Sequence, residues 1–273
     1  MTDSANDELN DFTATPFTAL GRTRDVYRTG TGPTVLVISE MPGITPLVAD
    51  FARKVASAGC SVAMPHLFGR DGEPASNGAY RRALRQVCVS REFVLFSSGT
   101  SSPVTKWLNE LAHHEHATTG GPGVGVVGMC LTGGFALAMM VDPIVVAPVL
   151  SQPSLPIALR KSSKARGDLA ISDTERAAVA ARAAAGQCVV GLRFTGDPLV
   201  PAERFAALRA LLGDRFLGVE IDSSPTNKFG YAEKAHSVLT GDLGTDPASP
   251  THAALAQVME FLTSQLGVSS TAG

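Results

Sequence analysis

Short apolar runs alternate along this chain with stretches of helical spacing, and this alternation constrains the fold more than any other feature. The apolar runs lie at 34–39, 60–64, 124–129, 144–150, 189–194 and 216–221. They are continuous and rich in β-branched residues, as strands buried on both faces are. Stretches with a helical spacing of apolar residues lie at 46–58, 203–212 and 251–266. The alternation predicts an α/β fold, with a doubly wound, mostly parallel sheet and helices on both faces.

The length and composition favour one domain. The 273 residues are 44% hydrophobic, which is enough apolar material for one large core. We expect residues 1–30 to form an N-terminal extension with room for an edge strand, 31–267 to form the single domain, and 268–273 to form a flexible tail. The polar stretch 1–11 is expected to fray in solvent. The stretch at about 160–187 is expected to be a surface insertion, with an alanine-rich helix that serves as a scaffold or a lid.

The charge balance excludes several classes of partner. There are 23 basic and 25 acidic residues, which gives a formal net charge of −2. The chain lacks the basic excess that nucleic acids and anionic membranes attract, so we expect neither as a partner. The uncharged stretch 120–141 is about as long as a membrane span, but the glycines in its first half favour a buried strand, a turn and an apolar helix.

The cysteines and histidines indicate neither a disulfide scaffold nor a metal site. The four cysteines include no C-x-x-C pair, which is typical of a reducing compartment. The N-terminus lacks the positive stretch and apolar core of a secretory signal, so we expect a cytoplasmic protein. The cluster of His113, His114 and His116 does not have the H-E-x-x-H spacing of zinc enzymes, and a solvated helix end explains it.

The segment 126–134 places Cys130 where a buried strand turns sharply into a helix. Such a turn, called a nucleophile elbow, holds one side chain out above the sheet. Cys130 would then meet the positive end of a helix, and the N–H of Leu131 would serve as an oxyanion donor. The usual signature has Gly two residues after the nucleophile, where this chain has Thr132. The alternative is that Cys130 is one more small buried cysteine.

A thiol nucleophile needs a base, and two later loops supply the residues for one. Asp197 follows the predicted strand 189–194, and His236 follows the predicted last strand. Loops at the carboxyl ends of strands are where α/β sheets bind ligands. The order of nucleophile, acid and histidine along the chain is that of the α/β-hydrolases.

Five motifs occur in the order and at the approximate spacing of the dienelactone hydrolases, namely 39-SEMPG-43, 64-MPHLF-68, 128-GMCLTGG-134, 195-TGD-197 and 235-AHS-237. The chain resembles this family from about residue 35 to 266. The resemblance implies an α/β-hydrolase fold in which Asp197 orients His236, and His236 acts on Cys130 as base and later as acid. It also implies that the N–H of Met41 is a second oxyanion donor, and that Glu40 holds the resting thiol and helps to take its proton. The alternative for Glu40 is an exposed acid at a strand end.

The chain departs from the family at the residues that bind substrate. Family members that act in chlorocatechol breakdown hold the substrate carboxylate with arginines, one of them four residues after the catalytic histidine. Thr240 stands at that place here. Arg81 and Arg82 are candidates for the other arginine, although a surface helix also explains them, and His66 is a candidate pocket residue.

These features predict a monomeric, cofactor-free and metal-free hydrolase that opens a lactone or small ester through a covalent thioester. One alternative is a broader carboxylesterase or thioesterase with the same triad. The other is a non-catalytic protein that binds a small molecule on the same fold. The presence of Cys130, Asp197 and His236 together argues against the last alternative, because binding alone does not require all three.

Overall fold

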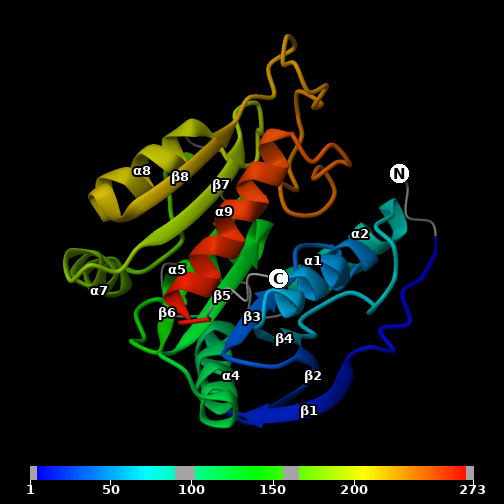
Figure 1. The fold of residues 1–273 in the computed structure, drawn as a ribbon, viewed down its shortest axis with the longest axis vertical. Helices are drawn as coiled ribbons and strands as arrows, with labels where there is room; N and C mark the ends of the chain where they lie inside the picture. The colour runs from blue at the N-terminus through cyan, green and yellow to red at the C-terminus, as the bar shows by residue number, and fades with distance from the viewer. Residues whose placement is uncertain (1–4, 90–101, 156–165, 269–273) are drawn as a thin grey trace.

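The computed structural model describes residues 5–89, 102–155 and 166–268, and eight strands form one sheet in the order β1-β2-β4-β3-β5-β6-β7-β8 (Figure 1). The strands are β1 (Thr13–Ala19), β2 (Arg22–Gly30), β3 (Thr34–Ile38), β4 (Ser61–Pro65), β5 (Val124–Met129), β6 (Val145–Ser151), β7 (Val189–Phe194) and β8 (Phe216–Ile221). The strands from β4 to β8 in this order are parallel to one another. β2 pairs antiparallel with β4, and β1 pairs antiparallel with β2. The predicted α/β class and mostly parallel sheet are confirmed.

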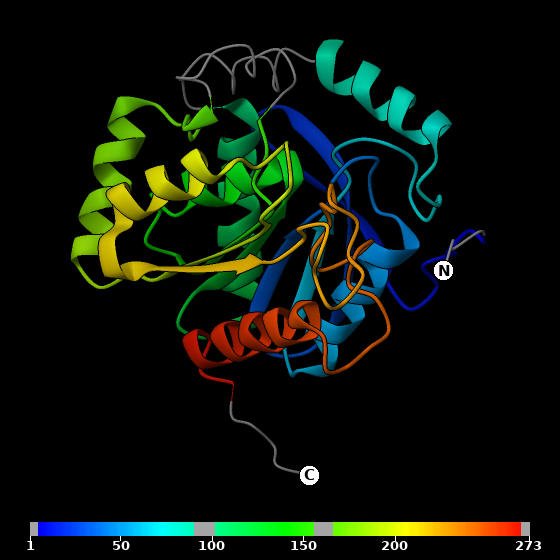
Figure 2. The same cartoon turned by 90° about the horizontal axis from the view of Figure 1, so that it is seen from above.

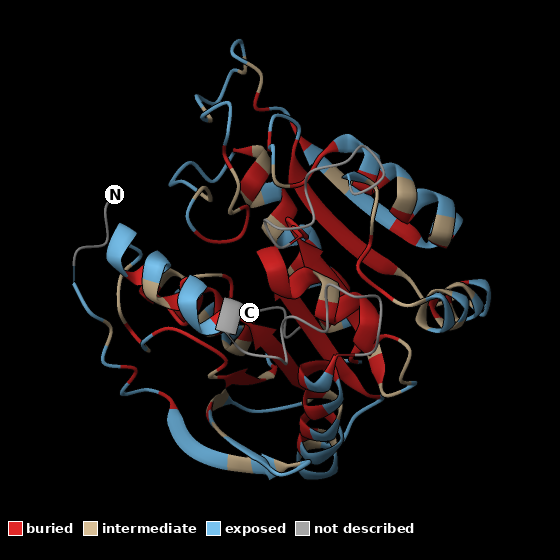
Figure 3. Cartoon of the chain, turned by 180° about the vertical axis from the view of Figure 1, so that it is seen from behind, coloured by how far each residue is buried: buried red, intermediate tan, exposed pale blue. Residues whose placement is uncertain are grey.

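Helices cover both faces of this sheet (Figure 2). They are α1 (Pro46–Ser57), α2 (Asn77–Val89), α4 (Pro103–Thr119), α5 (Gly133–Met139), α7 (Asp173–Ala184), α8 (Ala202–Leu212) and α9 (Pro250–Gln265), with short 3-10 turns η1 (Cys130–Thr132) and η3 (Gly213–Arg215). On one face Phe51 of α1 and Val258 of α9 join the core. On the other face Leu108 of α4, Phe135 of α5 and Phe205 of α8 do so. Figure 3 shows the buried sheet between helices whose outer surfaces are exposed.

The stretch 120–141, which has the length of a membrane span, forms β5, η1 and α5 as predicted. Every residue of β5 is buried, because parallel strands covered on both faces have no solvent side. Within the described part of the chain, no helix has both the length and the apolar character needed to cross a membrane.

The expectation that residues 1–11 fray in solvent is wrong for residues 7–11. Leu9 is buried in the core that α1 lines. Arg53 of α1 donates hydrogen bonds to the carboxylates of Asp7 and Asp11. One apolar side chain and two acidic ones therefore fix a stretch whose overall polarity suggested a free end.

The helix in the stretch 160–187 packs against the body of the protein. Val179 and Ala183 of α7 are buried in the core shared with α5 and α8. Arg182 donates hydrogen bonds to the carbonyl oxygens of Met140, Asp142 and Val145. These contacts are typical of a scaffold helix. Residues 156–165, and 269–273 of the predicted tail, lie outside the described residues.

Candidate active site

The residues predicted for the catalytic centre come together at the carboxyl edge of the sheet. Glu40 follows β3, Cys130 follows β5, Asp197 follows β7, and His236 lies in the long loop after β8. Because these strands are parallel, their carboxyl ends lie at the same edge, which is where open α/β sheets bind their ligands.

Cys130 occupies a strained turn between β5 and α5. Its φ of 56° lies in the left-handed region that residues with a side chain seldom adopt. The turn closes tightly, because a Cβ at Gly128 would overlap the carbonyl oxygen of Thr132. Thr132, at the position where glycine is usual, accepts a hydrogen bond from Met129 N and donates to the carbonyl oxygen of Ile38 at 2.9 Å. Its hydroxyl thus ties the elbow to the end of β3.

His236, which is half-buried, pairs with the buried Asp197. Nδ1 of His236 lies 2.6 Å from Oδ2 of Asp197, and the Asp197 side chain is fully buried. The other Asp197 oxygen accepts the N–H of Leu199, and Asp242 accepts the N–H of His236 at 2.8 Å. Both members of the pair are therefore fixed by their own loops.

The charge state of His236 follows from its surroundings. Burial lowers the pKa of the imidazole, but the hydrogen bond to Asp197 and the interaction with Cys130 raise it, to about 11. Nε2 is buried and makes no hydrogen bond within the described part of the chain. Asp197 and an ionised Cys130 therefore favour the imidazolium form once the ring has taken a proton, and Nε2 is shielded from solvent.

The Cys130 sulfur contacts the hydroxyl of Ser154, with Sγ and Oγ 3.1 Å apart. Both residues are buried. Ser154 lies in the turn after β6, and no motif in the sequence indicates that it approaches Cys130. The structure therefore pairs the thiol with Ser154, where the family resemblance implied Glu40.

Glu40 is buried, so the alternative that it is an exposed acid is wrong. One carboxylate oxygen accepts hydrogen bonds from Gln152 Nε2 at 3.0 Å and Ser237 Oγ at 2.8 Å. The other oxygen accepts the hydroxyl of Thr240. Three neutral donors thus satisfy this carboxylate, and two of them come from the loop that carries His236.

The two predicted oxyanion donors follow neighbouring strands at the same edge of the sheet. Leu131 is in η1, directly after Cys130. Met41 directly follows Glu40 after β3, the strand that pairs with β5. Its N–H has no hydrogen-bond acceptor among the residues that the structure describes.

Residues 22–266 match the sequence model of a protein family that is described as "Dienelactone hydrolase family". The chain belongs to the dienelactone hydrolase family. No curated protein matched the sequence. The predicted membership and α/β-hydrolase fold are thereby confirmed.

Solved structures of dienelactone hydrolase-like proteins share the fold. One is a protein from Klebsiella pneumoniae subsp. pneumoniae MGH 78578 that is described as a dienelactone hydrolase. It is 16% identical to this chain, with a TM-score of 0.59 over 94% of this chain and 100% of its own. A dienelactone hydrolase-like promiscuous phosphotriesterase from metagenomic libraries is 15% identical, with a TM-score of 0.60 over 94% and 98%. A thioesterase domain from the curacin biosynthetic pathway is 10% identical, with a TM-score of 0.57 over 92% and 99%. At these identities the likeness is one of fold.

In this dienelactone hydrolase family member, the three predicted substrate-binding residues make other contacts. Arg82 of α2 pairs with Glu73, and Arg81 is exposed and donates to the carbonyl oxygen of its own helix. His66 lies 2.6 Å from Asp71, which raises the pKa of its imidazole. These contacts are among the described residues, and none of them joins the Cys130 centre.

Tyr80 of α2 is a neighbour of the site that the sequence reasoning missed. Burial raises the pKa of the Tyr80 hydroxyl to about 12, and the nearby charges of Glu40, Cys130 and Asp242 add to this. Its side chain stays partly exposed. The only hint in the sequence is that Tyr80 is an aromatic residue in an otherwise arginine-rich helix.

Proposed function

We propose that this protein hydrolyses a lactone or small ester through a thioester formed on Cys130, with His236 and Asp197 completing the triad. The observation that carries the proposal is the meeting, at one sheet edge, of a cysteine in a strained elbow and a histidine that is paired with a buried aspartate. This arrangement supplies a nucleophile, a proton carrier and a group that orients the carrier.

The proposed reaction has two halves. The Cys130 thiolate attacks the carbonyl carbon, and the N–H groups of Leu131 and Met41 stabilise the oxyanion. Each of these donors lowers the activation barrier by about 3 kcal/mol. The carbon–oxygen bond of the ester then breaks, and the leaving oxygen takes a proton from His236. Water next attacks the carbonyl carbon of the thioester while His236 takes a proton from the water. The carbon–sulfur bond then breaks, which releases the acid and restores the Cys130 thiolate.

The environment of Glu40 supports a neutral substrate. Thr240 stands where the resemblance leads one to expect an arginine that binds a substrate carboxylate, and its hydroxyl instead donates to the Glu40 carboxylate, as does that of Ser237. Hydroxyl groups carry no charge to offset an anion. We therefore place neutral lactones and esters ahead of carboxylate-bearing dienelactones, and this same feature favours a broader carboxylesterase or thioesterase as the second candidate function.

The test compares wild type with Cys130→Ser and His236→Ala. Each protein is assayed with a neutral lactone, a carboxylate-bearing lactone and p-nitrophenyl acetate, and a stalled acyl-enzyme is sought by intact-mass spectrometry. We expect turnover by wild type, its loss in both variants, and an acyl adduct on Cys130. The ratio of lactone to ester rates separates the two candidate functions. If wild type and variants are equally inactive while a lactone still binds, the protein is a small-molecule binder and the proposal fails.

We also propose that the enzyme is a cytoplasmic monomer. Among the described residues, the large apolar side chains that are exposed lie on four separate segments: Leu20, Tyr80, Leu84, Leu217 and Phe229. Scattered apolar residues of this kind are normal on monomers. Light scattering of the purified protein at several concentrations tests this, and a constant mass near twice 28.3 kDa would contradict it.

A further inference from the structure

We infer that Ser154 is a positioning residue for the nucleophile, whose hydroxyl orients the Cys130 sulfur and favours its thiolate form. The inference rests on the proposed function of Cys130. It starts from the 3.1 Å contact between Sγ and Oγ. Ser154 is 3% exposed and Cys130 is 8% exposed, so water does not replace this contact easily.

The turn that carries Ser154 is fixed by contacts on every side. The N–H of Ser154 donates to the carbonyl oxygen of Cys130 at 2.9 Å, which joins the two residues by backbone as well as by side chain. Gln152, two residues before Ser154, has a φ of 36° and donates its N–H to the carbonyl oxygen of Leu192 on β7. A residue with a side chain holds such a conformation only where its surroundings impose it.

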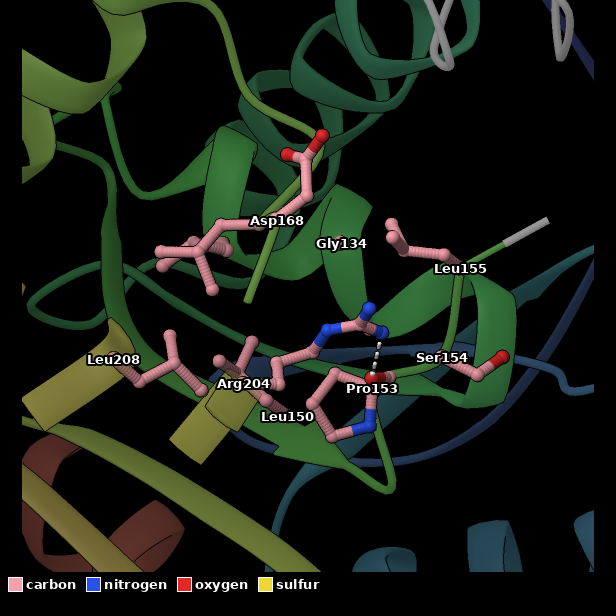
Figure 4. Close-up of a pocket in the computed structure, with 11 residues that line it drawn as sticks. Gly134, Leu150, Pro153, Ser154, Leu155, Asp168, Arg204 and Leu208 are labelled. Carbon is pink, nitrogen blue, oxygen red and sulfur yellow. Dashed lines mark hydrogen bonds between the residues drawn. The ribbon is translucent and has the colours of Figure 1, made fainter. Parts of the chain in front are cut away.

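Residues of α5 and α8 also contact this turn, at Pro153. Nη1 of Arg204, a buried residue of α8, donates to the carbonyl oxygen of Pro153 at 3.0 Å (Figure 4). Gly133 of α5 permits a close approach, because a Cβ there would overlap Pro153. Ser154 lines a small pocket between this turn, α5 and α8, and Figure 4 shows its hydroxyl pointing away from Arg204. The hydroxyl is thus directed by a rigid support.

A hydroxyl group suits both states of the sulfur. It accepts the S–H of the thiol and donates its own hydrogen to the thiolate. Hydrogen bonds to an ionised partner are the stronger ones, so the contact favours the thiolate. When Cys130 ionises, its S–H bond breaks and the proton goes to Nε2 of His236, while Ser154 keeps its own proton. Glu40 is less suited to this task, since both of its oxygens already accept hydrogen bonds from other residues.

The test is the pH dependence of Cys130 alkylation by iodoacetamide, followed by peptide mass mapping so that the other cysteines do not interfere. We expect Ser154→Ala to raise the pH of half-maximal alkylation rate by about one unit, because a hydrogen bond to an ionised group is lost. Ser154→Thr keeps the hydroxyl and is expected to restore the wild-type profile. Ser172→Ala, which removes the N-cap hydroxyl of α7, is the control for general destabilisation and is expected to leave the profile unchanged.

A wild-type alkylation profile in Ser154→Ala, or a shift to lower pH, would overturn the inference. If the alanine variant does not fold by circular dichroism, Ser154→Gly replaces it. Turnover provides a second readout, in which kcat for the preferred ester should fall about tenfold at pH 7 with KM unchanged. The alkylation profile needs no substrate. It therefore tests Ser154 even when wild type turns over no ester and the proposed function fails.

Discussion

At the scale of single residues, two strained positions define the site. Cys130 and Gln152 both have a left-handed backbone without being glycine, which costs on the order of 1 kcal/mol or more each. The strain directs side chains to particular partners: Cys130 to the Ser154 hydroxyl and Gln152 to the Glu40 carboxylate. Packing against α5 and α8 maintains it. The elbow at Cys130 and the turn after β6 therefore hold the Cys130 sulfur and the Ser154 hydroxyl against each other.

The first prediction concerns Asp197. Replacement with Asn keeps the shape but removes the charge that raises the pKa of His236, and the amide no longer selects the tautomer with hydrogen on Nδ1. We expect kcat to fall by about 10²- to 10⁴-fold while the fold is retained. Steady-state kinetics with p-nitrophenyl acetate, together with circular dichroism, measure this. A folded Asp197→Asn variant with kcat within twofold of wild type would rule out the orienting role.

At the scale of elements, the loop after β8 is as important as any helix. It runs from the end of β8 to α9 without a helix or strand, and internal hydrogen bonds hold it in place. Asp242 accepts the N–H groups of both His236 and Ser237. Because the same loop supplies Ser237 and Thr240 to Glu40, it fixes the histidine and the acid at the end of β3 together.

The second prediction tests that loop. Asp242→Ala leaves two backbone N–H groups without their acceptor, which costs about 1–3 kcal/mol locally. We expect kcat to fall about tenfold through a misplaced His236, with a small loss of global stability. Asp246→Ala, which removes a similar carboxylate–backbone bond from an exposed part of the loop, is the matched control and should retain kcat. Equal kcat values for the two variants would show that Asp242 does not position His236.

The third prediction concerns α7. Arg182 is the donor to three carbonyl oxygens at the end of α5 and the start of β6. Its replacement with Met removes all three bonds, and we expect a loss of about 2–3 kcal/mol in the free energy of unfolding. If α7 is a scaffold, kcat of the folded variant stays unchanged. Urea denaturation and kinetics measure the two quantities, and an altered kcat at unchanged stability would instead favour a lid.

The elements differ in how much the sequence discloses. The strands at 124–129, 189–194 and 216–221 begin and end where predicted, and the other three predicted strands are displaced by no more than one residue at either end, because continuous apolar runs report burial directly. The proximity of Cys130, Asp197 and His236 follows from parallel strands with polar residues at their ends. Ser154 was not predictable, since its turn reads as an ordinary Gln-Pro-Ser loop and its contact with Cys130 arises only when β5 and β6 pair.

At the scale of the whole molecule, the N-terminal residues close one side of the sheet. Leu9 and Phe12 add to the core on the α1 face. Asp7 N donates to the carbonyl oxygen of Gly72, which joins the N-terminal segment to the loop before α2. The β1–β2 hairpin then extends the sheet, with the largely exposed β1 at its edge (Figure 3). The segment before β1 thus connects α1 with the loop that leads to α2 and Tyr80.

The last prediction is that acid releases this segment. The hydrogen bonds from Arg53 lower the pKa of Asp7 and of Asp11 below the ordinary value of 3.8. Groups with a lowered pKa stabilise the folded state above the unfolded value, and this contribution is lost as the pH falls through the folded values. Because the pairs are partly exposed, solvent screening limits the effect to about 1 kcal/mol or less.

Amide hydrogen exchange gives the measurement. Protection factors for residues 7–12 should fall between pH 6 and pH 3, while those in β5 persist. In Arg53→Met the same residues should be poorly protected at both values, since the charged partner is absent throughout. High salt should imitate part of the acid effect on wild type. Equal protection at pH 6 and pH 3 in wild type would mean that Leu9 and Phe12 hold the segment by apolar packing alone, and that the charges around Arg53 contribute nothing measurable.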